Sequence, residues 1–167
     1  PHRMSNGNLL SLIGHYGAEE VDILGNVVTR WHASQHPNPE ANAEVPEGSI
    51  PVATETFHHD IQEMPSGNLL VLSTGMRRIE NYPTVVGDDR APKAAAKVIG
   101  DIVVEFARDG SIVNQWKLMD LLDVQRLGYE SLGGAWNNWA YVDVEGGTKD
   151  WAHANSVSYD AATDSIL

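Results

Sequence analysis

The sequence Asn6-Gly7-Asn8-Leu9-Leu10-Ser11-Leu12 returns as Ser66-Gly67-Asn68-Leu69-Leu70-Val71-Leu72, a displacement of 60 positions from Leu9 to Leu69. Each copy joins a turn to a short apolar run. The glycine of the turn can take the positive φ angle of a tight connection, and the run is typical of a β-strand. A unit repeated in this way indicates an architecture in which every copy forms the same local structure. We therefore expect repeated β-sheet units.

The strand pattern continues beyond these segments. Val21–Trp31 returns as Val104–Trp116, with the two tryptophans 85 positions apart. The difference between 85 and 60 places an insertion of 25 residues between Ser73 and Ile102. Turn dipeptides such as Asp109-Gly110 separate the runs, as in hairpins. A recurring order of strand, turn, strand, turn and strand is that of a propeller blade. We predict an all-β fold, a β-propeller; a stack of two sheets is the alternative, but it does not explain the recurring turn order.

Three stretches fall outside the repeat. Gln35–Pro51 is rich in Pro, Asn, Glu and Ala and predicts a long loop. Asn81–Lys97 predicts another, within which Ala94–Val98 turns helical. Lys117–Leu132 has apolar residues at helical spacing and indicates a short α- or 3₁₀-helix. Long loops at one end of a propeller commonly carry function.

Composition limits the classes of partner. The chain has 167 residues, 23 acidic and 11 basic, with a formal net charge of −12. No basic stripe could neutralise phosphates, so neither nucleic acid nor an anionic membrane is an expected partner. There is no cysteine for disulfides or thiolate metal sites, and no apolar run approaches the ~20 residues of a membrane helix. Because the sequence begins with Pro1 and not with Met, and because it ends at Leu167 within a strand-like pattern, we expect a fragment of a longer chain.

Two histidine-bearing segments stand at matching points of the repeat, Phe57-His58-His59-Asp60-Ile61 and Asp150-Trp151-Ala152-His153-Ala154-Asn155-Ser156. Equivalent positions of a repeat lie at equivalent radii, so His59 and His153 are expected to converge on one site. Histidine suits proton transfer or nucleophilic attack near neutral pH. Neighbouring strand residues face opposite ways, and the register favours His59 as the inward one of the pair. His153 and Asn155 would share one face of an extended chain and bind sulfuryl or phosphoryl oxygens.

Structural roles stay open for these residues. Asp60 is suited to capping a backbone amide in a tight turn, and Asn155 to satisfying backbone groups of a polar loop. A metal site built from His58, His59, Asp60 and His153 is a competing chemistry, although no His-x-His spacing supports it.

The tryptophans divide into two groups. Trp31 and Trp116 are repeat-equivalent and are expected in the blade cores, whereas Trp136, Trp139 and Trp151 are candidates for the wall of a pocket. No glycine-rich phosphate loop or P-loop lysine is present, so nothing supports nucleotide-dependent chemistry.

At these residues the chain resembles the bacterial arylsulfate sulfotransferases, propeller enzymes that use no nucleotide sulfate donor. The resemblance rests on Phe57–Ile61 with Met64–Asn68, on Gly100–Phe106, and above all on Lys149–Val157. It implies a six-bladed propeller, of which this chain would cover two to three blades. Residues 1–56 would form a first blade portion and its loop, 57–150 a second blade with insertions, and 151–167 the start of a third.

The resemblance implies an activity. A channel histidine attacks the sulfuryl group of a phenolic sulfate ester, and a second phenol accepts the group from a sulfohistidine. By motif position His59, His153 and Asn155 would be catalytic, with His58 and Trp151 binding substrate. The family's nucleophilic histidine and a channel arginine would fall beyond Leu167, so the fragment alone would be inactive.

The resemblance also implies a location and partners. We expect a periplasmic or secreted protein without cofactor or metal, whose partners are the donor, the phenol acceptor and the remainder of the propeller chain. A homo-oligomer is left open. Two other functions remain alternatives, a non-catalytic propeller segment for binding or scaffolding and a metal-dependent propeller hydrolase.

Overall fold

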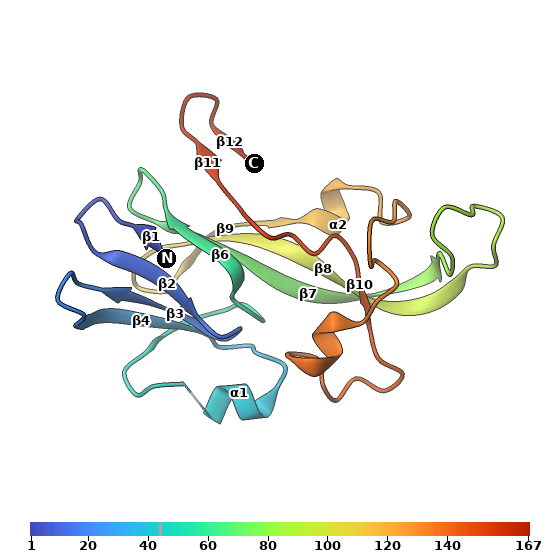
Figure 1. The fold of residues 1–167 in the computed structure, drawn as a ribbon, viewed down its shortest axis with the longest axis horizontal. Helices are drawn as coiled ribbons and strands as arrows, with labels where there is room; N and C mark the ends of the chain where they lie inside the picture. Colours follow the sequence, from blue (N-terminus) through green and yellow to red (C-terminus); the bar gives the residue numbers. More distant parts are fainter. Residues whose placement is uncertain (44) are drawn as a thin grey trace.

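The computed structural model describes residues 1–43 and 45–167, apart from the side chain of Asn42. The chain is all-β, with 41% of its residues in strands and 7% in helices. Figure 1 shows sheets that lie beside one another, and none closes into a ring. The predicted fold class is confirmed in this form, as open sheets of the propeller type. Within the described residues, no helix is both long enough and apolar enough to cross a membrane.

The first sheet, sheet A, holds five strands in chain order. They are β1 (His2–Arg3), β2 (Leu9–Ile13), β3 (Gly17–Val21), β4 (Val27–Ala33) and β5 (Ile50–Val52). The first four pair antiparallel, and β5 runs parallel to β4. Between β4 and β5 the predicted loop contains a short helix, α1 (Pro39–Ala43).

The second sheet, sheet B, is built on the longest hairpin. Its strands are β6 (His58–Glu63), β7 (Leu69–Tyr82), β8 (Ala94–Phe106), β9 (Ile112–Lys117) and β10 (Lys149–Asp150). The pairs β6–β7, β7–β8 and β8–β9 are antiparallel, and β10 runs parallel to β8. The helix α2 (Leu118–Leu121) and the 3₁₀-helix η1 (Ala135–Asn138) lie between β9 and β10, and a separate hairpin of β11 (Tyr159–Asp160) and β12 (Ser165–Ile166) follows.

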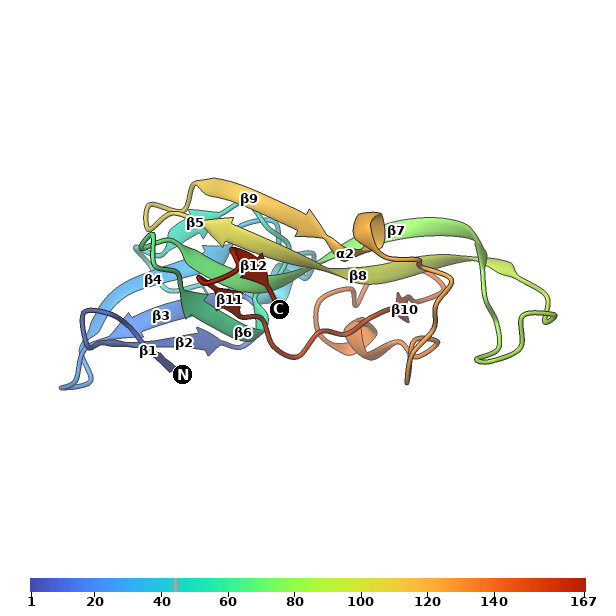
Figure 2. The ribbon, with the colours of Figure 1, turned by 90° about the horizontal axis from the view of Figure 1, so that it is seen from above.

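The 25-residue insertion lengthens a hairpin, and the predicted loop is confined to its tip, residues 83–93. The strands β7 and β8 pair from Leu69–Phe106 to Tyr82–Ala94, and Figure 2 shows this arm projecting past the other sheets. The predicted helix at Ala94–Val98 is wrong, because this segment is the start of β8 and Val98 is fully buried. Cross-strand pairing overrides the helix propensity of its alanines. The predicted short helix after Lys117 is confirmed as α2.

The sheets pack through one core cluster. Leu10 and Trp31 of sheet A are buried against Val104 and Phe106 of sheet B, with the Trp31 and Phe106 rings 6.2 Å apart in an edge-on contact. Burying each such side chain contributes about 1.5–3 kcal/mol. The predicted core position of Trp31 is confirmed, whereas Trp116, predicted to occupy the same kind of core, is only partly buried and lines a cavity. The opposite face of sheet B packs against the chain around β11 and β12, so both of its faces are used.

Candidate active site

Three histidines from separate parts of the chain meet around one pocket. His15 lies in the turn between β2 and β3, His59 in β6, and His153 three residues after β10. The rings of His59 and His153 lie 4.9 Å apart at 78°. Ala135, Trp136 and Trp139 complete the lining of this pocket, which has a volume of about 170 Å³. The structure thus brings together the two histidines expected to converge and adds a third.

A bulge at the start of β6 brings His58 and His59 into contact. His59 has a φ of +56°, and the pairing with β7 shifts register between His58 and Ile61. The two Nδ1 atoms lie 2.8 Å apart. The two rings touch because a left-handed residue interrupts the alternation of an extended strand. His59 is nevertheless the one of the pair that lines the pocket, as the repeat register favoured. Of the two, His58 is fully buried and His59 is the exposed one.

The buried ring fixes the tautomer of the exposed one. His58 Nε2 lies 3.2 Å from the Ser73 carbonyl oxygen and 3.3 Å from Asp101 Oδ1. Both are acceptors, so Nε2 carries a proton and Nδ1 of a neutral His58 is an acceptor. His59 then donates its Nδ1–H to His58 and keeps a lone pair on Nε2. Burial, followed by the neighbouring His58, lowers the pKa of His59, which favours this neutral form.

His153 is held by a loop of unusual backbone geometry. Ala152 and His153 have φ angles of +74° and +41°. The preceding Trp151 donates its backbone N–H to the Ile99 carbonyl at 2.9 Å, which anchors the loop on β8. Asp150 Oδ2 accepts a hydrogen bond from His153 Nδ1. Burial raises the pKa of Asp150, and the contact with His153 opposes that rise.

Asp101 connects the two histidine segments. It lies on β8 opposite Thr74 and is 2% exposed. One carboxylate oxygen faces His58, and the other accepts the Ala154 backbone N–H at 3.0 Å. Neither Asp101 nor the contact between Asp150 and His153 was identified from the sequence, although both aspartates lie in the segments that carry the family resemblance.

Strained backbone is concentrated at this site. Among the described residues, five non-glycine residues have a positive φ, and His59, Ala152 and His153 are three of them. Each such conformation costs of order 1–3 kcal/mol and persists only where surrounding contacts enforce it. Strain of this kind gathers at functional sites.

Asn155 does not share a face with His153, contrary to the prediction for an extended chain. The left-handed His153 backbone turns the chain, and Asn155 Nδ2 donates to the His153 carbonyl at 2.9 Å. Its side chain is exposed and does not line the pocket. This is the structural alternative that the sequence left open, an amide that satisfies a backbone group.

Two other predicted substrate contacts are placed in the protein interior. Trp151 is 3% exposed, packs with Tyr82 and Val98, and donates its indole N–H to the Arg126 carbonyl at 3.1 Å. The expected pocket-wall position of Trp151 is therefore wrong, since its ring fills a core cluster. His58, also expected to touch substrate, is fully buried and contacts His59 instead.

Asp60 caps a backbone amide, as one of its two interpretations predicted. Its Oδ2 accepts the Val157 N–H at 3.0 Å, and its Oδ1 lies 2.6 Å from His2 Nε2. Among the residues described, no group of three or more His, Cys, Asp or Glu is arranged to hold a metal ion.

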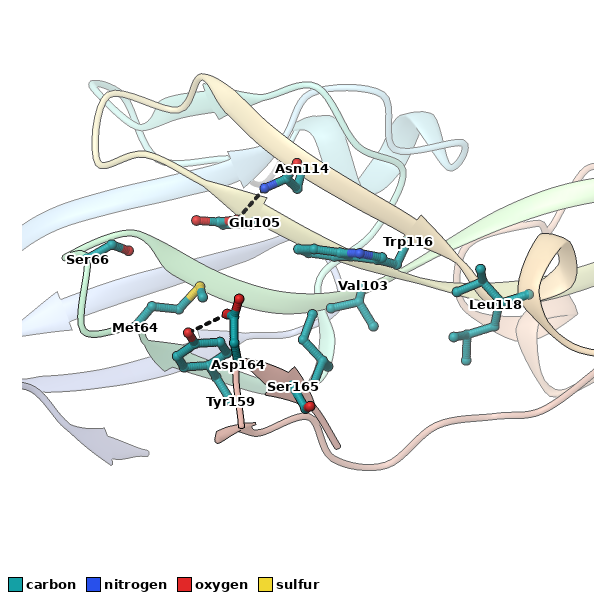
Figure 3. Close-up of a pocket in the computed structure, with 12 residues that line it drawn as sticks. Met64, Ser66, Val103, Glu105, Asn114, Trp116, Leu118, Tyr159, Asp164 and Ser165 are labelled. Carbon is teal, nitrogen blue, oxygen red and sulfur yellow. Dashed lines mark hydrogen bonds between the residues drawn. The ribbon is translucent and has the colours of Figure 1, made fainter. Parts of the chain in front are cut away.

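A larger cavity lies elsewhere and has a different character. It measures about 720 Å³ and is bounded by the outer face of sheet B and the β11–β12 hairpin (Figure 3). Glu105 and Trp116 on its wall are the repeat counterparts of Glu20 and Trp31, which are buried where sheet A meets sheet B. The cavity is therefore the counterpart of a sheet–sheet interface, not of the histidine pocket.

The fold and the site together define the class of protein. It is an all-β protein of propeller-type sheets with a pocket lined by histidine and tryptophan side chains. The chain matches the family described as Arylsulfotransferase (ASST) over residues 2–167. It therefore belongs to the arylsulfotransferase family. No curated protein and no solved structure gives a significant match.

Proposed function

We propose that the protein transfers a sulfuryl group from a phenolic sulfate ester to a phenol through a sulfohistidine, and that the His59–His153 pocket is part of the transfer site. Family membership supports the sulfuryl chemistry. One observation supports this position for the transfer site. The ring centroids of His59 and His153, one from each of the two family-like motifs, lie 4.9 Å apart beside a pocket that two indoles also line.

The pocket has room for the aryl group of a substrate. Its volume of about 170 Å³ is close to the ~150 Å³ of an apolar cavity that takes benzene. Trp139 is 56% exposed, so its ring is available to stack on a substrate ring. Trp136 is buried and holds the imidazoles in place, with its ring centroid 5.0 Å from His58 and 6.0 Å from His153.

The imidazoles have separate roles in this proposal. A further histidine of the full-length polypeptide attacks sulfur, the S–O bond to the donor phenol breaks, and the phenolate leaves. His59 Nε2, with its lone pair free, then accepts the proton of the acceptor phenol, whose oxygen attacks sulfur as the S–N bond breaks. His153, its Nδ1 bonded to Asp150, stabilises the negative sulfuryl oxygens. Asn155 fixes the His153 loop through the carbonyl that it binds.

The test measures sulfuryl transfer from a chromogenic phenyl sulfate to phenol by the full-length polypeptide that contains these residues. Loss of a general base lowers kcat by about 10²–10⁴-fold, and loss of a group that stabilises developing charge by about 10²–10³-fold. We expect His59→Asn and His153→Asn to fall in these ranges. The matched control is His32→Asn, in β4 and outside the pocket.

The mechanism has its own readout. Quenching the reaction with donor alone should leave one sulfuryl group on a histidine, detected by peptide mass spectrometry. A protein that hydrolyses or transfers nothing, or variants at His59 and His153 that keep full activity, would instead favour a binding or scaffolding role. Export to the periplasm or beyond is a further part of the proposal, to be checked by fractionating cells that express the full-length gene.

A further inference from the structure

His15 reaches the pocket through a turn that backbone contacts hold in place. Its carbonyl accepts the Phe57 N–H at 2.9 Å, directly before His58, and the Tyr16 carbonyl accepts the Ala33 N–H at 2.8 Å. A β-carbon on Gly17 would lie 2.8 Å from the Trp31 carbonyl oxygen, so the turn sits tightly on β4. Sheet A thereby fixes a histidine against the first residues of sheet B.

The His15 ring contacts the same indoles that form the pocket wall. Its centroid lies 5.6 Å from Trp136 at 75° and 5.1 Å from Trp139 at 53°. The ring therefore stands between the two tryptophans and faces the space that His59 and His153 also line.

Among the pocket imidazoles, His15 differs in its hydrogen bonding. His59 is bonded to His58, and His153 to Asp150. In the described part of the protein, His15 Nδ1 is buried without a hydrogen-bond partner. A buried N–H without an acceptor is costly, so a neutral His15 is expected to carry its proton on the other ring nitrogen, Nε2. Among the described residues Nε2 is not buried and has no protein partner, so its N–H can donate to a ligand in the pocket.

Electrostatics are consistent with a neutral donor at this position. Burial, followed by the nearby His58, His36 and His153, lowers the pKa of His15. A neutral imidazole has one N–H to donate and adds no further positive charge beside the other rings. Sulfuryl oxygens are acceptors only, so they match that N–H.

We propose that His15 is a substrate-contact residue that donates a hydrogen bond to the sulfate group of an aryl sulfate ester bound between His59 and His153. The inference rests on the proposed function, which it deepens by adding a binding group from the neighbouring sheet. Repeat reasoning does not find His15, because the equivalent position of sheet B, 60 residues later, is Gly75 inside the long hairpin.

Two substitutions separate hydrogen bonding from packing. His15→Phe keeps an aromatic ring between Trp136 and Trp139 but removes both nitrogens. His15→Gln keeps an amide NH₂ near the position of Nε2 and loses the ring. His32→Phe is the matched control, because His32 Nδ1 is also buried without a partner but does not line the pocket.

The experiment measures the Kd of phenyl sulfate by indole fluorescence on the full-length polypeptide, beside KM and kcat for transfer. Loss of a hydrogen bond to a charged group predicts a Kd about 10- to 100-fold higher in His15→Phe. His15→Gln should recover part of the affinity, and His32→Phe should match wild type. Urea midpoints of all three variants check folding, and His15→Phe should unfold no earlier than wild type because it removes an unsatisfied nitrogen.

Each outcome decides between the two ideas. Wild-type Kd and kcat/KM in His15→Phe would overturn the inference and leave His15 as a packing residue, while sulfotransfer by the wild type would still support the proposed function. If the wild type binds the ester but transfers no sulfuryl group, and His15→Phe binds it more weakly, the proposed function would be refuted and the binding role of His15 would be supported. A wild type that does not bind the ester at all would overturn the inference.

Discussion

Replacing Asp101 with asparagine tests whether one buried carboxylate holds the two histidine segments together. Asp101 is 2% exposed, and one of its oxygens accepts the Ala154 N–H at 3.0 Å. The other oxygen lies 3.3 Å from His58 Nε2, whose N–H is hydrogen-bonded to the Ser73 carbonyl. An asparagine of the same shape has one acceptor and one NH₂ group. Whichever way the amide turns, its NH₂ faces the Ala154 N–H or the His58 Nε2–H and cannot accept from either.

The expected loss follows from these two contacts. The asparagine oxygen can keep the Ala154 hydrogen bond, but as a bond between neutral groups it is weaker by about 0.5–1 kcal/mol. Its NH₂ group is then buried beside the His58 N–H without an acceptor, which costs about 1–3 kcal/mol. The free energy of unfolding should therefore fall by about 1.5–4 kcal/mol. Asp143→Asn is the matched control, because Asp143 is exposed and its replacement should change stability by less than about 0.5 kcal/mol.

Urea titration of the full-length polypeptide gives the result, as a lower midpoint for Asp101→Asn at an unchanged m-value. Sulfuryl transfer gives a second readout below the unfolding transition: if Asp101 secures the tautomer of the histidine pair, kcat should fall more than KM rises. An Asp101→Asn protein as stable as Asp143→Asn would refute the reasoning, because it would mean that the carboxylate contacts contribute nothing net.

Three further predictions concern stability. Asp60→Asn should lower the unfolding free energy by about 1 kcal/mol, because the amide cannot accept from both of its present donors; urea midpoints measure it. Gly110→Ala should lower the unfolding free energy by about 2–4 kcal/mol, because a β-carbon there would lie 2.3 Å from a backbone oxygen of β5 and the residue has a φ of +87°. Gly67 has a similar φ, +84°, but open space around it, so Gly67→Ala should lower the unfolding free energy by only about 1 kcal/mol; urea midpoints compare the two. Burial lowers the pKa of His15 in the folded state, so below the unfolded value of about 6.5 only the unfolded chain takes up that proton. Wild type should therefore lose more stability than His15→Phe between about pH 7 and 5.5; equal losses would contradict the burial effect.

The repeat made most of the fold predictable. Turn glycines, apolar runs and two matched tryptophans lead directly to two hairpin-built sheets, and Trp31 is buried where the repeat puts it. The inserted residues were harder, because Ala94–Val98 has local helix propensity and its strand character comes from pairing with residues 12 to 21 positions earlier in the chain. Local sequence does not contain that information.

The candidate site was predictable only at the level of which segments meet. Equivalent repeat positions lead to His59 and His153, and those rings are in contact. The roles of Trp151 and Asn155 depended on side-chain direction, which the positive φ angles of Ala152 and His153 change. No extended-strand argument anticipates a left-handed residue that is not glycine, because the surrounding contacts, not the residue type, enforce it.

The pocket also shows how one residue type can supply different chemistry. His153 Nδ1 is hydrogen-bonded to the Asp150 carboxylate, which leaves Nε2 as the nitrogen that can face a ligand. His59 is bonded to a second imidazole whose Nε2–H faces Asp101 and Ser73, so a neutral ring with a free lone pair is favoured there. His15 has no protein partner at Nδ1. The proposed sulfuryl transfer needs one group that stabilises the negative sulfuryl oxygens and another that accepts a phenolic proton. The partners of these imidazoles, contributed by β7, β8 and β10, create that difference between otherwise identical side chains.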